Sequence, residues 1–346
     1  MSRYHIEITT RVFHFKEPAG TSRGVYHTRT SRFVRLICDD MPGIAGVGEC
    51  APLPRLSCDD MPDYDAVLRR LCDDVCARGS IDVDALRDWP SMLFGLETAW
   101  RQLHAGGSTA LSATPFARGQ EGISINGLVW MGDFDTMAAR LEQKLAQGFS
   151  CVKIKIGAID FADEIALIAR LRDRYGSDRI ELRVDANGAF PYGEALYKLE
   201  LLSQYALHSI EQPIRQGQWG NMAELCRDAP LPIALDEELI GVNDPEQKRQ
   251  LLQIVKPAYI VLKPSLHGGM QGCREWIDTA RDLGVGSWIT SALESNIGLH
   301  AIAQFCSAVY GPAIRLPQGL GTGQLFTDNI PMSLEIRGDQ LWLKTD

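Results

Sequence analysis

The sequence predicts an α/β protein that combines a modified (β/α)7β barrel of the TIM type with a smaller α+β capping domain. From about residue 123 onward, short apolar strand candidates alternate with amphipathic stretches of helical length. The repeat is roughly 25–30 residues long and continues for some 190 residues, which suits the seven or eight strand–helix units of a closed parallel barrel. No glycine-rich nucleotide-binding motif follows any of these strands, so an open doubly wound sheet lacks its usual support.

The N-terminal part of the chain, residues 1–122, is expected to form the capping domain, and the tail at 318–346 to complete it. Three strands and two helices are predicted there, at 4–15, 31–39, 44–50, 64–76 and 91–105. A polar, glycine-containing stretch at 18–24 is predicted to be the loop between the first two strands. Apolar residues recur on one face of the second helix, and we expect that face to lie in the core.

The barrel is expected to comprise residues 123–317. Its predicted strands are 123–128, 151–156, 180–184, 209–210, 232–235, 259–262 and 286–289. Between them the helical period is clear; for example, Phe161, Ile165 and Ile168 share one face of a helix that ends before Gly176. The alternating apolar residues at 332–344 predict strands that return to the N-terminal unit.

Composition narrows the classes of function. The chain has 346 residues, 45% hydrophobic and 23% charged, with a net charge of −9 and no cluster of lysine and arginine. These values are typical of a soluble globular protein and argue against nucleic acid or an anionic membrane as a partner. No segment has the length and hydrophobicity of a membrane span or a signal peptide. Nine cysteines without a C-x-x-C pair predict free thiols and a cytoplasmic location. None of these features specifies an oligomeric state.

The stretch at 151–157 contains the first unusual pattern. Its two-residue period places Lys153 and Lys155 on one face of a strand and apolar residues on the other. A solvent-exposed antiparallel strand would give the same pattern at little cost. In a buried parallel strand, however, two like charges side by side are expensive. The acidic residues that follow in the chain favour the second interpretation.

Charged residues recur where the later strands end. Asp185, Glu211, Asp236 and Lys263 follow one another at intervals of 26, 25 and 27 residues, which is about one strand–helix unit each. Taken alone, each has an ordinary explanation, such as a helix N-cap or a solvated rim residue. In a barrel, all of them converge on the rim where such barrels place their active sites.

This set of residues restricts the chemistry. Three carboxylates with open positions suit a hard divalent cation, Mg²⁺ or alternatively Mn²⁺, and not zinc. Such an ion binds the carboxylate of a small-molecule substrate and stabilises the charge that develops when the adjacent carbon loses a proton. A lysine acting as a base must lose its own proton near neutral pH, and a cationic neighbour such as Lys153 beside Lys155 favours that loss.

The order of these motifs resembles that of the enolase superfamily, and within it the muconate-lactonizing subgroup. The matching motifs are K-x-K at 153–155, D-x-N at 185–187, E-Q-P at 211–213, D-E at 236–237 and K-P-S at 263–265. The use of Mg²⁺ with a lysine or histidine base is a known pattern of that superfamily. The mandelate-racemase branch would place a histidine base near the seventh strand. No histidine lies between His267 and His300, so that branch is disfavoured.

The resemblance covers nearly the whole chain and implies roles for individual residues. The implied metal ligands are Asp185, Glu211 and Asp236. The implied catalytic residues are Lys155 and Lys263, with Lys153 supporting the first.

Within the subgroup, the stretches at 291–298 and 318–323 look most like those of o-succinylbenzoate synthases, which are dehydratases. N-Succinylamino acid racemases and dipeptide epimerases are the alternative, although an acidic D-x-D motif usual in the epimerases is absent. A metal-binding barrel without catalysis is a further alternative, against which both lysines argue. Capping loops at 20–23 and 48–54 are expected to select the substrate. Candidate substrate contacts are Arg23, Ser291 and Glu294, although a solvated loop arginine is the ordinary interpretation of Arg23.

Overall fold

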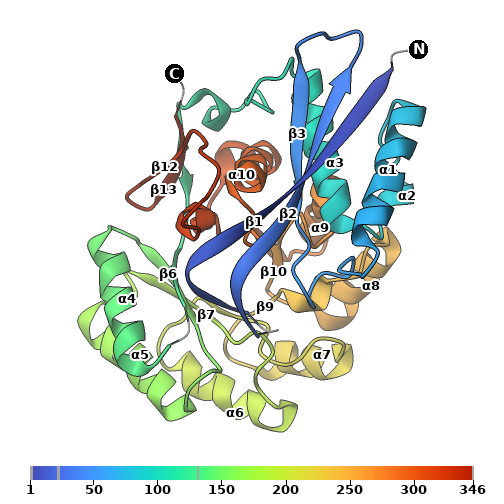
Figure 1. Ribbon diagram of the computed structural model, residues 1–346. Coiled ribbons are helices and arrows are strands. Elements are labelled where there is room, and N and C mark those ends of the chain that lie inside the picture. Colours follow the sequence, from blue (N-terminus) through green and yellow to red (C-terminus); the bar gives the residue numbers. More distant parts are fainter. Residues whose placement is uncertain (1–2, 22–23, 131, 345–346) are drawn as a thin grey trace.

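A computed structural model of the chain describes residues 3–21, 24–130 and 132–344. It contains a three-stranded antiparallel sheet, a seven-stranded parallel sheet that curls into a barrel, and a second small sheet of three strands (Figure 1). The predicted α/β class, with a barrel and a separate cap, is therefore confirmed. Within the described ranges, no helix is both long enough and apolar enough to cross a membrane.

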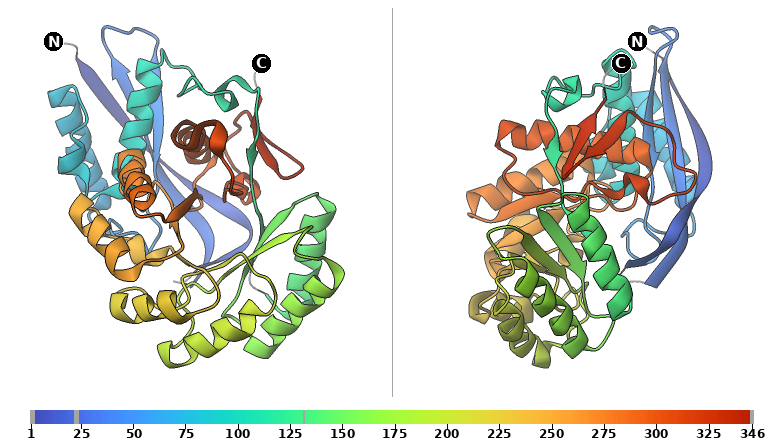
Figure 2. Two further views of the ribbon diagram at one scale, coloured as in Figure 1. Left: turned by 180° about the vertical axis from the view of Figure 1, so that it is seen from behind. Right: turned by 90° about the vertical axis from the view of Figure 1, so that its left-hand side faces the viewer.

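The capping sheet is dominated by a long hairpin. Its strands are β1 (Tyr4–Thr21), β2 (Gly24–Cys38) and β3 (Ala45–Cys50), in that order across the sheet. The predicted loop at 18–24 is wrong for most of its length, because Ala19 pairs with Tyr26 and both side chains are buried. A break in register between His14 and Ala19 interrupts the alternation there, so the sequence pattern fails although the pairing resumes. Figure 2 shows the hairpin extending along one side of the molecule from the cap to the barrel.

Three helices complete the cap: α1 (Tyr64–Arg78), α2 (Val83–Leu86) and α3 (Pro90–His104). The predicted apolar stripe of α3 is buried, as expected. Close approach between α3 and β3 depends on glycine, since a Cβ atom on Gly48 would lie 1.8 Å from the carbonyl oxygen of Gly95. The cap is therefore a sheet with helices packed directly on one face.

The barrel repeats strand and helix seven times. Its strands are β5 (Gly127–Val129), β6 (Cys151–Lys155), β7 (Glu181–Asp185), β8 (Ser209–Glu211), β9 (Ile233–Leu235), β10 (Tyr259–Leu262) and β11 (Gly286–Ile289). Its helices are α4 (Phe134–Ala146), α5 (Phe161–Arg174), α6 (Tyr192–Ser203), α7 (Trp219–Asp228), α8 (Pro245–Val255), α9 (Gly269–Asp282) and α10 (Asn296–Tyr310). Short 3-10 helices lie at η1 (Phe116–Arg118), η2 (Glu237–Leu239), η3 (Gly311–Ala313) and η4 (Thr322–Gln324).

A short final segment closes the barrel. Gln318 forms a parallel bridge with Ile125, just before β5, and Gly319 forms one with Thr290, just after β11. Hydrogen bonds run from the Gly319 amide to the Ile289 carbonyl and from the Asn126 amide to the Gln318 carbonyl. Residues 318–319 therefore act as the eighth strand, and the (β/α)7β arrangement is confirmed.

The predicted strand at 123–128 is divided between two sheets. Its first part, β4 (Ile123–Ser124), pairs with β13 (Gln340–Leu343), which in turn pairs with β12 (Leu334–Arg337). The two strands of the tail therefore form a sheet with β4, while Phe326 of the tail forms a bridge with Phe15 of β1. The sequence Ile-Ser-Ile-Asn-Gly-Leu at 123–128 does not reveal this change of partner, because its pattern does not mark where one strand ends and the next begins. The exact boundaries of the domains remain a prediction.

Glu97 links the cap to the barrel. This α3 residue is 6% exposed, and its carboxylate accepts hydrogen bonds from the amides of Met270 (2.5 Å) and Gln271 (3.0 Å) in the first turn of α9. A Cβ atom on Gly269, where φ is +70°, would lie 2.4 Å from that carboxylate, so glycine is required there. Burial raises the pKa of Glu97 from 4.5 to about 7.

This raised pKa predicts a pH-dependent stability. Because the folded state binds the Glu97 proton more tightly than the unfolded state does, stability falls as pH rises from about 4.5 to about 7. Relative to Glu97→Gln, the wild type should lose up to about 3 kcal/mol of unfolding free energy across that window. Denaturant titrations of both proteins at pH 5 and pH 7.5 measure this difference. Equal pH dependence in the two proteins would show that Glu97 does not titrate in this range.

Candidate active site

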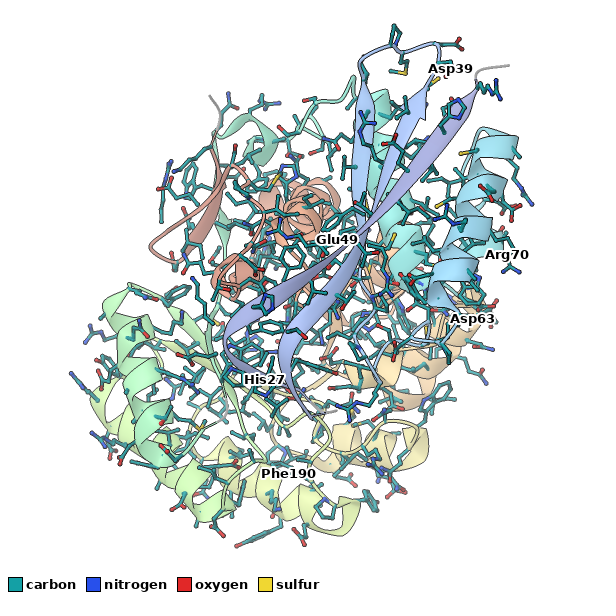
Figure 3. All side chains as sticks on the ribbon, viewed as in Figure 1. His27, Asp39, Glu49, Asp63, Arg70 and Phe190 are labelled. Atoms are coloured by element: carbon teal, nitrogen blue, oxygen red, sulfur yellow. The ribbon has the colours of Figure 1, made fainter. Side chains whose placement is uncertain are left out.

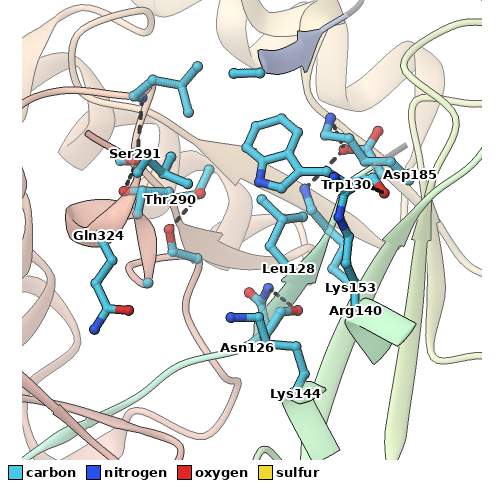
Figure 4. A pocket seen from close by; sticks show the side chains of 18 of the residues that line it. Asn126, Leu128, Trp130, Arg140, Lys144, Lys153, Asp185, Thr290, Ser291 and Gln324 are labelled. Carbon is cyan, nitrogen blue, oxygen red and sulfur yellow. Dashed lines mark hydrogen bonds and ion pairs between the residues drawn. The ribbon is translucent and has the colours of Figure 1, made fainter. Parts of the chain in front are cut away.

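A cavity of about 520 Å³ lies where the carboxyl ends of the barrel strands meet the cap. The cap contributes residues 16–19 of the hairpin together with Leu53 and Leu56. The barrel contributes strand-end residues and the loop that follows β11. Figure 4 shows Lys153 and Asp185 on one side of the cavity and Thr290, Ser291 and Gln324 on the other.

The two lysines of β6 point into the barrel. Lys153 pairs in register with Leu128 of β5, while Val152 and Ile154, on the opposite face, are fully buried. The Lys153 ammonium group donates to Asp185 Oδ2 at 3.0 Å and to the two carboxylate oxygens of Glu211 at 3.0 and 2.9 Å. The alternation in this strand therefore belongs to a buried parallel strand and not to a solvent-exposed one.

Sheet register brings Lys155 to the same carboxylates. Lys155 is paired with Asp185, and Asp185 with Glu211, so that the ends of three neighbouring strands form one row. The Lys155 ammonium group donates to Asp185 Oδ2 at 3.1 Å and to Asn187 Oδ1 at 2.6 Å. Equal strand–helix spacing thus places these side chains together, as predicted.

Lys263 lies across the barrel from Lys155. It directly follows β10, and its ammonium group donates to Asp236 Oδ2 at the end of β9. In the order of strands, β7, β8 and β9 separate β6 from β10 on one side, and β11, residues 318–319 and β5 separate them on the other. The two lysines therefore face each other from opposite walls.

The charges in this site perturb one another. Burial opposes the charge of Lys153, but the carboxylates of Asp185 and Glu211 outweigh it and raise the pKa of Lys153. Burial and the negative charge of Asp185 together raise the pKa of Glu211 to about 8. Burial acts on Asp185 as well, but Lys153 and Lys155 hold its pKa well below the ordinary value. Burial raises the pKa of Asp236 against the opposing charge of Lys263. The site is therefore a buried cluster of paired opposite charges.

The chain matches the family described as "Enolase C-terminal domain-like" over residues 136–331. It belongs to the enolase superfamily. The o-succinylbenzoate synthase of Desulfotalea psychrophila (strain LSv54 / DSM 12343) is 46% identical to it, over 94% of this chain and 95% of the relative. These matches confirm the resemblance seen in the sequence motifs.

Solved structures of the superfamily have the same fold. MenC from Desulfotalea psychrophila LSv54 superimposes with a TM-score of 0.84 and 40% identity, covering 98% of this chain and 99% of MenC. A dipeptide epimerase from Cytophaga hutchinsonii, solved with Mg and the dipeptide D-Ala-L-Val, gives a TM-score of 0.83 at 21% identity, covering 99% and 93%. At that identity, the second similarity shows the fold alone.

The acidic residues at the centre of this superfamily barrel suit a hard divalent cation. Asp185, Glu211 and Asp236 are each at most 2% exposed. Among the described residues, Asp236 Oδ1 and Glu237 Oε2 are buried acceptors without a hydrogen-bond partner. Oxygen donors of this kind are what Mg²⁺ and Mn²⁺ prefer. Within the same part of the chain, no three acidic, histidine or cysteine side chains are already arranged as a metal site, because the Lys153 ammonium group lies between Asp185 and Glu211.

The three candidate substrate contacts have different outcomes. Ser291 lines the cavity and its hydroxyl lies 2.5 Å from that of Thr322. Glu294 is fully buried, is not part of the cavity wall, and accepts from Ser265 Oγ and from the amide of Ala292. Its expected contact with substrate stays a prediction. Arg23 lies outside the described residues.

Sequence reasoning missed three residues of the site. Trp130 lines the cavity, with its ring centroid 5.8 Å from the Lys155 ammonium group. Asn187 accepts from Lys155, and its own amide donates to Glu237 Oε1 at 3.0 Å. Asn187 and Glu237 lie within the D-x-N and D-E motifs, so those motifs were a usable signal. Trp130 has no such signal, because only the fold places it beside Lys155.

Proposed function

We propose that this protein is a Mg²⁺-dependent o-succinylbenzoate synthase, which removes water from 2-succinyl-6-hydroxy-2,4-cyclohexadiene-1-carboxylate in menaquinone biosynthesis. The observation that carries the proposal is the 46% identity to the o-succinylbenzoate synthase of Desulfotalea psychrophila, across nearly the full length of both chains. The facing lysines and buried carboxylates support it, because they suit proton transfer at a carbon next to a carboxylate.

The residues that would hold the metal ion are Asp185, Glu211 and Asp236. When bound, Mg²⁺, or Mn²⁺ as the alternative, would bind the substrate carboxylate and stabilise the negative charge that develops there. Lys153 would hold Asp185 and Glu211 in place, since its ammonium group bonds to both.

Lys155 is proposed to act as both base and acid. Its neutral amine takes the proton from the carbon bearing the ring carboxylate, and the electrons of that C–H bond enter an enediolate. The enediolate then collapses with cleavage of the C–O bond, and the Lys155 ammonium group returns the proton to the departing hydroxide as water. Both transfers occur on one face of the ring, which makes the elimination syn. Lys263, on the opposite wall, remains cationic and stabilises the enediolate.

Racemisation of N-succinylamino acids, or epimerisation of dipeptides, is the second candidate. The observation in its favour is that Lys155 and Lys263 lie on opposite walls, as two bases exchanging a proton with one carbon must. Dehydration uses one lysine for both transfers, whereas racemisation uses both lysines.

A small carboxylate substrate and a cytoplasmic location form part of the proposal. All nine cysteines are free thiols, which supports a reducing compartment. The cavity of about 520 Å³ is of a size that suits a small molecule.

The decisive experiment compares the two reactions in the purified protein. With Mg²⁺ present, we expect conversion of the cyclohexadiene substrate to o-succinylbenzoate, followed by ultraviolet absorbance, and loss of that activity after chelation. N-Succinylamino acids are the parallel substrate, with exchange of the α-proton for solvent deuterium as the readout. Efficient racemisation without dehydration would replace the proposal by the second candidate.

A further inference from the structure

Arg29 is a buried cation that the proposed chemistry does not use. It lies on β2, is 2% exposed and is among the largest fully buried side chains of the described chain. Burial lowers its pKa, while the charges of Glu294 and Glu49 act in the opposite direction. A buried guanidinium is costly unless it is paired and hydrogen-bonded, so the groups that Arg29 binds indicate its role.

The partners of Arg29 belong to the cap wall of the cavity. Its Nη1 donates to the carbonyl of Pro52 at 2.8 Å and its Nη2 to the carbonyl of Ala51. These residues immediately precede Leu53, which lines the cavity together with Leu56. The 51–57 loop belongs to no helix or strand, so side chains determine where it lies.

Other bonds hold the loop in shape without fixing it to the barrel. The Tyr26 hydroxyl, also from β2, donates to the carbonyl of Pro54 at 2.7 Å. Within the loop, the Leu53 amide donates to Ser57 Oγ at 2.8 Å. Arg29 and Tyr26 thus attach the loop to β2, and Arg29 alone of the two carries a charge that acts beyond the cap.

The two acidic residues whose charges act on Arg29 bond to the barrel beside the cavity wall. Glu294 accepts from the amide of Ala292, which lines the cavity. Glu49 of β3 accepts from the amides of Ser295 (2.9 Å) and Gly298 (2.9 Å) at the start of α10. Figure 3 labels Glu49 in the interior, where the capping sheet passes α10. A carboxylate is favourable at the N-terminus of a helix.

We propose that Arg29 is a positioning residue that holds the 51–57 loop of the cap against the 291–295 loop of the barrel and thereby sets the width of the cavity. Its hydrogen bonds tie the loop to β2. Glu49 ties β2 to the barrel, because its carboxylate accepts from Ser31 Oγ of β2 and from the amide of Ser295. The consequence for substrate affinity rests on the proposed function, whereas the effect on the loop does not.

A purely structural role makes a different prediction, and Lys248 provides the matched control. Lys248 is fully buried, donates to the carbonyl of Gly272 at 3.1 Å and pairs with Glu275 at 2.8 Å. It is not among the residues that line the cavity. Removing either cation should lower thermal stability, but only Arg29 should alter the cavity.

The test compares Arg29→Met, Arg29→Lys and Lys248→Met in the full chain by hydrogen–deuterium exchange and steady-state kinetics. In Arg29→Met, amide exchange at 51–57 should rise roughly tenfold, and in Lys248→Met it should stay at the wild-type rate. KM for the cyclohexadiene substrate should rise roughly tenfold in Arg29→Met while kcat changes less than threefold. Arg29→Lys keeps the charge but not the planar guanidinium that bonds to two carbonyls at once, so its exchange rate and KM should lie between those of the wild type and Arg29→Met.

The outcomes separate this inference from the proposed function. Unchanged exchange at 51–57 in Arg29→Met, or equal changes in Lys248→Met, would overturn the inference whatever the enzyme catalyses. Failure of the wild type to dehydrate the substrate would contradict the proposed function, and exchange at 51–57 would still decide the role of Arg29. A fall in kcat with KM unchanged would also contradict a positioning role in binding. If Arg29→Met does not fold, the same criteria apply to Arg29→Lys.

Discussion

Replacing Lys155 by arginine should reduce kcat for dehydration by about 10³-fold or more. Arginine keeps the positive charge that Asp185 requires, but it does not give up a proton near neutral pH and so cannot take one from carbon. General base catalysis by a single residue contributes roughly 10²–10⁴-fold, and here one residue is proposed to perform two proton transfers. Stopped assays at saturating substrate measure the loss.

The control for this change is another lysine of the same cavity. Lys144→Arg alters a cavity-lining lysine of α4 that has no proposed part in the reaction, and it should leave kcat within about threefold of wild type. Deuterium exchange into substrate should also stop in Lys155→Arg, since no proton leaves carbon. A Lys155→Arg protein that retained more than a few per cent of the wild-type rate would assign the base to another group.

The centre of the site was predictable because its residues are tied to the period of the barrel. Asp185 and Glu211 are the last residues of their strands, and Asp236 and Lys263 directly follow theirs. Equal spacing along the chain therefore places the four side by side around the barrel. The alternation at Lys153 and Lys155 fixes which face of β6 they share. Sequence spacing and strand alternation therefore suffice to predict a side chain's position wherever a single strand–helix unit determines it.

Other parts depended on contacts between distant segments. Residues 123–128 have the sequence Ile-Ser-Ile-Asn-Gly-Leu, and nothing in that stretch shows that β4 pairs with the tail while β5 begins the barrel. Glu294 follows the seventh strand much as the other acidic residues follow theirs, yet it is fully buried and accepts a hydrogen bond from Ser265. The cap wall of the cavity likewise depends on Arg29, which donates to carbonyls 22 and 23 residues further along the chain. Such contacts leave no local pattern.

Replacing Asp236 should separate two roles that this carboxylate combines. It accepts a hydrogen bond from Lys263, whose side chain is only 14% exposed, and it is one of the three proposed metal ligands. Asp236→Ala leaves a nearly buried ammonium group without its partner and removes a ligand, so turnover should fall by about 10³-fold or more. Asp236→Asn keeps an acceptor oxygen for Lys263 but loses the negative charge.

Comparing the two variants decides which role matters. If Asp236 only orients Lys263, Asp236→Asn should keep most of the activity, because an amide oxygen still accepts the hydrogen bond. If the negative charge is needed to hold Mg²⁺, Asp236→Asn should be as inactive as Asp236→Ala, and that is the result we expect. Thermal unfolding gives a readout independent of turnover, since a ligand that binds only the folded state raises Tm with concentration. Added Mg²⁺ should raise the Tm of the wild type and of neither variant; a wild-type response in Asp236→Asn would remove Asp236 from the metal site.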